Sequence, residues 1–243
     1  MMKIFKQIPN TITSMNVLCG VLGVIAAFNG NNHIAFYFML AGAVCDFCDG
    51  LAARALNAYS PMGKELDSLA DLITFGLLPS IMLYKCMDWY HPGMWYCYIP
   101  LISVVFSALR LAKFNIDERQ SENFIGLATP ACAMFCGSFA TISHMDIMNI
   151  ARPVTESPWI IPAASVILSL LLVSEIPMFS MKFKKGADYD LILRSIVFIA
   201  ISAVVIICYF AFGKHFSHAI FIIFAIYILM NLFHAVMAKK SEE

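Results

Sequence analysis

The stretch that decides the fold lies at residues 46–71 and reads DFCDGLAARALNAYSPMGKELDSLAD. Its four aspartates, Asp46, Asp49, Asp67 and Asp71, fall within or at the ends of two long apolar segments. An ionised group inside a membrane helix costs roughly 3 kcal/mol on insertion scales. Four such groups in two neighbouring helices therefore require a strong compensating interaction.

The polar and glycine positions of this stretch recur every three or four residues, which places them on one face of each helix. The first face holds Asp46, Asp49, Gly50 and Arg54, and the second holds Gly63, Asp67 and Asp71. A turn near Asn57–Pro61 folds the second segment back against the first, so we expect the two carboxylate faces to meet. Gly50 and Gly63 leave room there for close helix approach or for a ligand.

The whole chain shares this apolar character. Of its 243 residues, 60% are hydrophobic and 13% are charged, whereas a soluble domain carries about a quarter charged residues. The apolar blocks match the roughly 20 residues that a helix needs to cross a bilayer. The sequence predicts an all-α, polytopic transmembrane bundle of about eight spans, preceded by a short N-terminal amphipathic segment at Met1–Pro9. The expected spans are Thr13–Phe28, Ile34–Leu56, Leu66–Cys86, Met94–Phe114, Phe124–Ile147, Trp159–Phe179, Leu191–Phe212 and Phe216–Ala238.

Positive charge predicts the orientation of these spans. With the N-terminus inside, three of the 16 basic residues fall outside, namely Lys85, Arg152 and Lys214. We therefore expect a multi-pass protein of the cell (inner) membrane whose termini and carboxylates face the cytoplasm. Residues 1–180 are expected to form a six-helix catalytic core, and residues 181–243 a pair of scaffold helices.

Several classes of function are disfavoured by composition. The formal net charge is zero, so no nucleic-acid partner is indicated. The eight cysteines, including the Cys45/Cys48 pair, lie mostly in apolar blocks and are interpreted as buried hydrophobes. None of the six histidines has a partner at zinc-ligand spacing.

Carboxylates on two facing helices are hard oxygen ligands that suit Mg²⁺ or Mn²⁺, and two ions would best neutralise four of them. Metal ions so placed can grip a pyrophosphate during an in-line displacement. One alternative is a structural polar cluster, or pairing of the carboxylates with Arg54 and Lys64. Another is a cation transporter, but the last four spans hold only Asp146 and Glu175 and lack a second aspartate cluster.

The aspartate stretch resembles the signature of the CDP-alcohol phosphotransferase family, D-x2-D-G-x2-A-R-x8-G-x3-D-x3-D, at every fixed position. The resemblance implies that Asp46, Asp49, Asp67 and Asp71 are metal ligands and that Asp71 is also the catalytic base. It further implies that Gly50, Ala53, Arg54 and Gly63 bind the CDP-lipid. Homodimers are usual in that family, and small residues such as Gly20, Gly23, Gly42 and Gly137 permit helix contact.

Further segments are similar to those of the phosphatidylserine synthases of this family. They are Ile8–Gly20, the RLAKFN run at Arg110–Asn115, the FIGLATPA run at Phe124–Ala131 and the SEIP run at Ser174–Pro177. Lys113 stands in place of an arginine of that pattern, and Ala128 in place of a proline. The resemblance implies transfer of a phosphatidyl group from CDP-diacylglycerol to L-serine within the membrane lipids.

The acceptor site is expected at the inner end of the fourth span. Arg110 can pair with the carboxylate of serine, and Lys113 and Asn115 are further candidates for binding the acceptor. The same chemistry with glycerol-3-phosphate or inositol phosphate is the nearest alternative. A phosphorylated acceptor favours more arginines at the inner ends of spans four to six, and Arg110 is the only arginine well placed within those spans.

Overall fold

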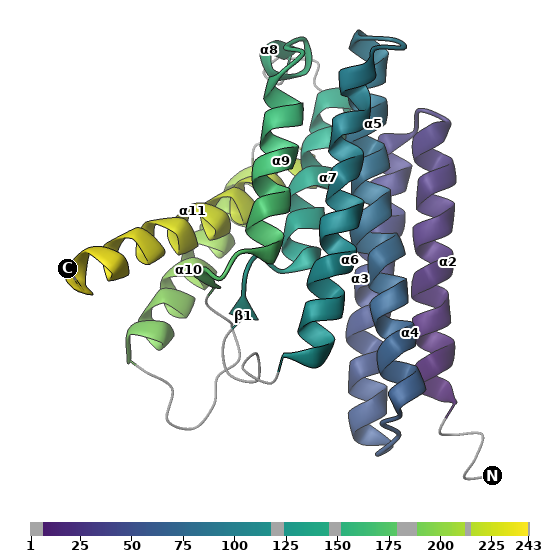
Figure 1. The fold of residues 1–243 in the computed structure, drawn as a ribbon, viewed down its shortest axis with the longest axis vertical. Helices are drawn as coiled ribbons and strands as arrows, with labels where there is room; N and C mark the ends of the chain where they lie inside the picture. The colour runs from purple at the N-terminus through teal and green to yellow at the C-terminus, as the bar shows by residue number, and fades with distance from the viewer. Residues whose placement is uncertain (1–6, 118–123, 146–151, 179–188, 212–214, 243) are drawn as a thin grey trace.

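The structure is a computed structural model that describes residues 7–117, 124–145, 152–178, 189–211 and 215–242, and it is almost entirely helical (Figure 1). In chain order the elements are α2 (Ile8–Phe28), α3 (Asn32–Ala55), α4 (Pro61–Asp71), η1 (Leu72–Leu77), α5 (Leu78–Tyr90), η2 (Trp95–Leu101), α6 (Ile102–Ile116), β1 (Phe124–Ile125), α7 (Thr129–Met145), α8 (Arg152–Thr155), α9 (Ile160–Val173), β2 (Pro177–Met178), α10 (Tyr189–Ala211) and α11 (Phe216–Glu242).

The prediction of an all-α polytopic membrane protein is confirmed. Five helical segments within the described ranges are long and apolar enough to cross a membrane, and α9 and the apolar part of α10 are shorter. Large apolar side chains such as Val44 and Phe47 remain exposed, as expected for helices that face lipid. The helices α2 to α7 and α9 follow the long axis of the bundle, whereas α10 and α11 are inclined to it (Figure 1).

The third span is longer than expected, because Pro61–Tyr90 forms one apolar segment of 30 residues instead of Leu66–Cys86. Its start is fixed by Ser60, whose hydroxyl accepts a hydrogen bond of 3.0 Å from the Gly63 amide, and by Pro61 in the first turn. Inside it, η1 is a π-helix directly after Asp71. Wide turns of this kind often occur at functional sites.

The π-helix inserts a threonine between the first two helices. Thr74 is fully buried, and its hydroxyl donates to the carbonyl oxygen of Asn16 at 3.0 Å. A Cβ atom added at Gly20 would lie 2.5 Å from Thr74 Oγ1, and one at Gly42 would lie 2.6 Å from Thr74 Cγ2. These two glycines, which the sequence marked for helix contact, therefore serve contacts within the chain that fix the segment carrying Asp67 and Asp71.

Two short strands lie where the sequence predicted the ends of two helical spans. The spans expected at Phe124–Ile147 and Trp159–Phe179 contain β1 and β2, which pair antiparallel with Ile125 opposite Pro177. The helix α7 begins only at Thr129, and α9 ends at Val173.

Gly126 makes this arrangement possible. Its φ is +77°, its amide donates to the Ile176 carbonyl at 2.9 Å, and the next amide, of Leu127, donates to Leu171 at 2.9 Å. The end of α9 therefore fixes the position at which α7 begins, although Ala128 stands where the family pattern has a proline.

A glycine-to-alanine pair tests this connection. Gly126 and Gly30 have nearly equal φ values, +77° and +78°, but a Cβ at Gly126 would lie 2.6 Å from the Leu172 carbonyl, whereas one at Gly30 meets nothing within 4 Å. We expect Gly30→Ala to lower the free energy of unfolding by about 1 kcal/mol and Gly126→Ala by about 2–4 kcal/mol. Thermal unfolding in detergent measures both. Equal losses would contradict the role of Gly126.

Candidate functional site

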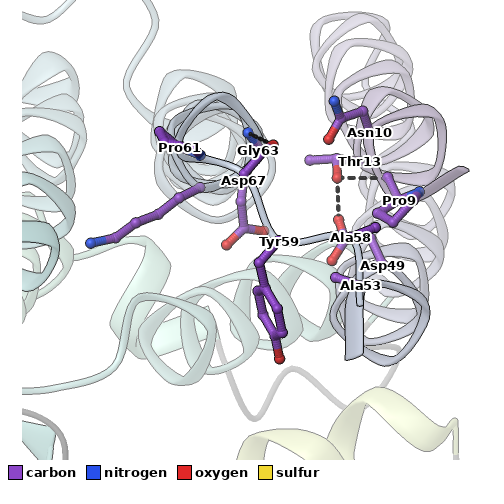
Figure 2. Close-up of a pocket in the computed structure, with 12 residues that line it drawn as sticks. Pro9, Asn10, Thr13, Asp49, Ala53, Ala58, Tyr59, Pro61, Gly63 and Asp67 are labelled. Carbon is purple, nitrogen blue, oxygen red and sulfur yellow. Dashed lines mark hydrogen bonds between the residues drawn. The ribbon is translucent and has the colours of Figure 1, made fainter. Parts of the chain in front are cut away.

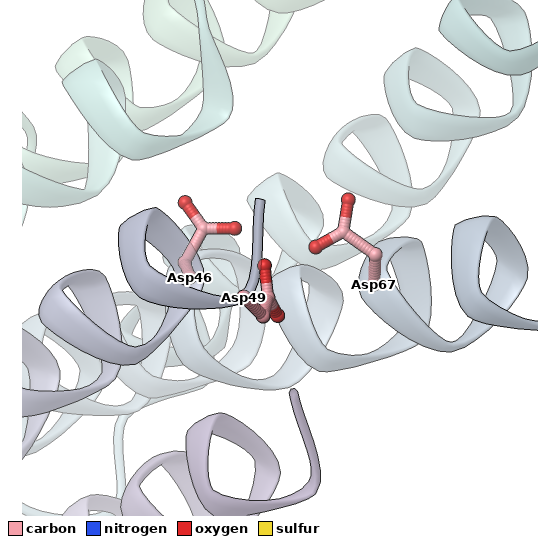
Figure 3. A group of neighbouring side chains, drawn as sticks. All are labelled: Asp46, Asp49 and Asp67. Carbon is pink, nitrogen blue, oxygen red and sulfur yellow. The ribbon is translucent and has the colours of Figure 1, made fainter. Parts of the chain in front are cut away.

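The aspartates of α3 and α4 converge at the end of the bundle where the turn at residues 56–60 joins the two helices. Asp46, Asp49 and Asp67 each contribute a carboxylate oxygen, and these oxygens all lie within 4.8 Å of one another. Figure 3 shows Asp46 and Asp49 on one helix and Asp67 on its neighbour, with their carboxylates directed toward a shared space. The predicted meeting of the two carboxylate faces is therefore present in the structure.

Asp71 joins this cluster from the next turn of α4. Its carboxylate interacts electrostatically with Asp46 and Asp67, and also with Arg110 of α6. Asp49 is buried, and the other three aspartates are partly buried. Four buried or partly buried carboxylates are thus concentrated together, with one buried arginine that interacts with Asp71.

A residue of α2 that the sequence analysis did not single out holds one of the aspartates. Thr13 is 3% exposed, and its hydroxyl lies 2.5 Å from Asp49 Oδ2 and 3.0 Å from the Pro9 carbonyl oxygen. Thr13 lies in the Ile8–Gly20 run that resembles the family. The only local signal for its role is a hydroxyl on an apolar helix.

A pocket of about 500 Å³ opens onto the cluster. It is bounded by the start of α2, the end of α3, the turn and the start of α4 (Figure 2). Asp49 and Asp67 belong both to the pocket wall and to the carboxylate cluster. The remaining lining residues are Pro9, Asn10, Thr13, Ala53, Ala58, Tyr59, Ser60, Pro61, Gly63 and Lys64. Its volume is within the range of small-molecule sites.

The four residues expected to bind the CDP-lipid divide into two pairs. Ala53 and Gly63 line the pocket, and a Cβ at Gly63 would lie 3.0 Å from Asn10 Oδ1, so this glycine allows α2 to approach α4. Gly50 and Arg54 lie on the same helix as Ala53, and Arg54 Nε donates to the Gly50 carbonyl at 3.0 Å. Arg54 is exposed, and its guanidinium stays along its own helix.

The alternative pairing of the carboxylates with Arg54 and Lys64 does not occur among the described residues. Arg54 bonds to the Gly50 carbonyl, and Lys64 Nζ donates to the Asn115 carbonyl oxygen at 2.7 Å. The Asn115 amide in turn donates to Ser68 Oγ at 2.9 Å. These two bonds join the end of α6 to α4, and they place the predicted acceptor residue Asn115 beside the pocket-lining Lys64.

The two other predicted acceptor residues differ in burial, because Arg110 is buried whereas Lys113 is partly exposed. Arg110 is 7% exposed, and its Nη1 donates to Thr129 Oγ1 at the start of α7, at 3.0 Å. Lys113 Nζ lies 3.7 Å from Glu175 Oε1, and the two side chains are 36% and 72% exposed. Such an exposed pair contributes little stability, but it brings the RLAKFN and SEIP runs together. Four further basic residues close in sequence to these runs, Arg119, Lys182, Lys184 and Lys185, lie outside the described residues.

The donor set fits divalent cations. Asp67 Oδ1 and Asp71 Oδ1 are buried and have no hydrogen-bond partner in the described part of the chain. Carboxylate oxygens this close repel one another, and burial removes the water that would screen them. Hard cations such as Mg²⁺ and Mn²⁺ prefer oxygen ligands of this kind. Asp46, Asp49, Asp67 and Asp71 are therefore the residues that would hold the ions.

Fold and site together define a polytopic membrane protein with a carboxylate cluster that opens into a pocket at one end of its bundle. Residues 6–173 match the family model described as CDP-alcohol phosphatidyltransferase, and the chain belongs to this family.

Three relatives illustrate the similarity. The CDP-diacylglycerol–serine O-phosphatidyltransferase of Bacillus subtilis (strain 168) is 37% identical over 186 residues, which cover 76% of this chain and 96% of the relative. The enzyme of the same name from Helicobacter pylori (strain ATCC 700392 / 26695) is 35% identical over 128 residues, 52% of this chain and 54% of the relative. The archaetidylserine synthase of Methanothermobacter thermautotrophicus is 32% identical over 138 residues, 56% of this chain and 58% of the relative.

The Thr13–Asp49 hydrogen bond predicts a coupling between α2 and metal affinity. Thr13→Val keeps the shape of the side chain but removes the donor to Asp49. We expect the dissociation constant for Mn²⁺ to rise about tenfold, as for other groups that orient a metal ligand. Titration of the purified protein with Mn²⁺ measures it.

Thr11→Val is the matched control, because the exposed Thr11 hydroxyl donates to the nearby Gln7 carbonyl at 3.0 Å, at the start of the same helix. It should bind Mn²⁺ like the wild type. Unchanged affinity in Thr13→Val would refute the coupling.

Proposed function

We propose that this protein transfers the phosphatidyl group from CDP-diacylglycerol to L-serine and releases CMP and phosphatidylserine. The carboxylate cluster that opens directly into the pocket carries the proposal, because one site can then hold both a nucleotide and the ions that grip its pyrophosphate. The family membership supports the phosphotransfer. The names of the Bacillus and Helicobacter relatives support serine as acceptor.

The pocket suits the nucleotide part of the lipid substrate. Ala53 and Gly63 leave its walls open to a ligand, and Lys64 brings a positive charge that a phosphate attracts. Tyr59 is 73% exposed at the same pocket and offers a ring for stacking on a base. The acyl chains would remain in the surrounding lipid.

Two Mg²⁺ or Mn²⁺ ions are proposed on Asp46, Asp49, Asp67 and Asp71. When bound, such ions neutralise the pyrophosphate and the charge that develops on the departing CMP. The protein's own contribution is to fix the four carboxylates, through the facing of α3 and α4 and through the Thr13 hydroxyl on Asp49.

Asp71 is proposed as the catalytic base. It accepts the proton of the serine hydroxyl while the serine oxygen forms a bond to the lipid phosphorus. The bond between that phosphorus and the CMP oxygen breaks, and CMP leaves as the anion. Arg110 is proposed to pair with the serine carboxylate, because it is buried beside Asp71. Asn115 and Lys113 are proposed to form the outer part of the acceptor site.

We also propose a membrane location, an orientation and a domain organisation for the enzyme. The excess of basic residues on one side supports a cell (inner) membrane location, with the termini and active site in the cytoplasm. Residues 1–180 are proposed as the catalytic core, and a homodimer remains a prediction from the family resemblance.

An acceptor screen tests the proposed reaction. The purified protein is incubated with CDP-diacylglycerol, Mn²⁺ and one acceptor, either serine, glycerol-3-phosphate or inositol phosphate, and the lipid product is identified. Phosphatidylserine is the expected product. A product formed only with a phosphorylated acceptor would retain the phosphotransfer but reject serine, and no lipid product with any acceptor would reject both.

The role of Asp71 is tested by Asp71→Asn. Since the amide cannot accept the proton, we expect turnover to fall about 10³-fold. Asp88→Asn is the control, because Asp88 pairs with Lys85 at 3.3 Å, away from the cluster, and it should retain turnover. An active Asp71→Asn protein would exclude Asp71 as base.

A further inference from the structure

Arg110 lies between two positions at which α6 contacts the segment that carries the carboxylates. A Cβ atom added at Gly76 would lie 3.1 Å from Ser107 Cβ, so α6 packs closely against η1 there. Towards the other end of α6, the Asn115 amide donates to Ser68 Oγ of α4 at 2.9 Å. Arg110, which is 7% exposed, is therefore held beside the junction of α4 and η1, where the proposed catalytic base lies.

The Arg110 guanidinium is held by two neighbours and has one donor left over. Its Nη1 donates to Thr129 Oγ1 at 3.0 Å, and its central carbon lies 5.6 Å from the centre of the Phe114 ring. Its Nε is buried and has no hydrogen-bond partner among the residues that the structure describes. A buried donor without a partner is costly, which points to an acceptor atom that arrives with a ligand.

Thr129 is held between the end of α9 and the first turn of α7. It is fully buried and is the first residue of α7. Two residues before it, the Leu127 amide donates to the Leu171 carbonyl at 2.9 Å, and after it the Cys132 amide donates to the Ala128 carbonyl at 3.0 Å. The Thr129 hydroxyl therefore has a fixed position against which the guanidinium is held.

The bond to Thr129 leaves one edge of the guanidinium for a ligand. The group is planar, and its Nε–H points in the same direction as one N–H of Nη2, away from Nη1. A carboxylate that approaches the Nε edge can form two parallel, charge-assisted hydrogen bonds. A neutral amide offers one uncharged oxygen and cannot form this pair.

We propose that Thr129 is a positioning residue that turns the Nε edge of Arg110 toward the carboxylate of the acceptor, and that this contact selects serine over amino alcohols without a carboxylate. The inference rests on the proposed function. It adds a residue that the sequence analysis did not predict for the site, and it states which part of the acceptor the site recognises.

Thr129→Val tests the inference, because it keeps the shape of the side chain and removes the hydroxyl that holds Nη1. We expect the KM for serine to rise about tenfold, the effect of one hydrogen bond to a charged group, while kcat and the KM for CDP-diacylglycerol change less than twofold. Thr129→Ser restores the hydroxyl and should keep the KM for serine within about threefold of wild type. Phosphatidylserine formation at varied serine and varied CDP-diacylglycerol measures these constants.

Thr141→Val is the matched control for the loss of a buried threonine hydroxyl. Thr141 is also fully buried on α7, but its hydroxyl donates to the Gly137 carbonyl of the same helix at 2.7 Å. It should change neither KM by more than about twofold.

A second measurement compares L-serine with L-serinamide, which keeps the hydroxyl and the ammonium group but has an amide in place of the carboxylate. We expect the wild-type protein to prefer serine about 100-fold in kcat/KM. In Thr129→Val the preference should fall to about tenfold, because the variant weakens the use of serine but not that of serinamide.

Four results would overturn the inference: a wild-type KM for serine in Thr129→Val, equal losses with serine and serinamide, a Thr129→Ser protein as impaired as Thr129→Val, or a Thr141→Val protein impaired to the same extent. If the wild-type protein forms no phosphatidylserine, the proposed function fails and the inference fails with it. If the wild-type protein forms phosphatidylserine and Thr129→Val behaves identically, only the inference fails.

Discussion

The structure depends on the placement of four carboxylates in an apolar helical bundle, three of which bring oxygens within 4.8 Å of one another. Like charges repel strongly where water is scarce, and in the described part of the chain Asp67 Oδ1 and Asp71 Oδ1 are buried without a hydrogen-bond partner, although Arg110 interacts with Asp71. Divalent cations would balance these charges, and the oxygen ligands present fit them. The hydrogen bond from Thr13, the buried Arg110 and the close packing of Thr74 on two glycines all limit how these carboxylates can move.

One side of the site is formed by residues that are close together in the sequence, and the other side by residues that are far apart in it. The carboxylates and most of the pocket come from α3, a short turn and α4, which are adjacent in the chain. The contacts of Arg110 come from its own helix, α6, and from α7, and the pairing of β1 with β2 fixes where α7 begins. A sequence motif can describe the first side because helix periodicity relates its residues directly. The second side exists only after distant segments have packed.

This difference explains what the sequence predicts and what it does not. The apolar blocks predict the helices, and the spacing from Asp46 to Asp71 predicts that the carboxylates meet. The π-helix at Leu72–Leu77 is not visible in the hydrophobic pattern, because it arises where Thr74 packs against Gly20 and Gly42. The strands at Phe124–Ile125 and Pro177–Met178 are hidden for a similar reason, since each is two residues long and is defined by its partner.

The distribution of contacts along α4 agrees with an in-line displacement. Asp67 lines the pocket proposed for the nucleotide, whereas Asp71, one helical turn further along, interacts with Arg110. In-line transfer requires the incoming oxygen and the leaving group to lie on different sides of the phosphorus. A single helix that presents one aspartate to the leaving group and the next to the acceptor would satisfy this requirement. In this proposal, the four-residue spacing of the two aspartates places them on one helix face and also directs them to the two opposite sides of the phosphorus.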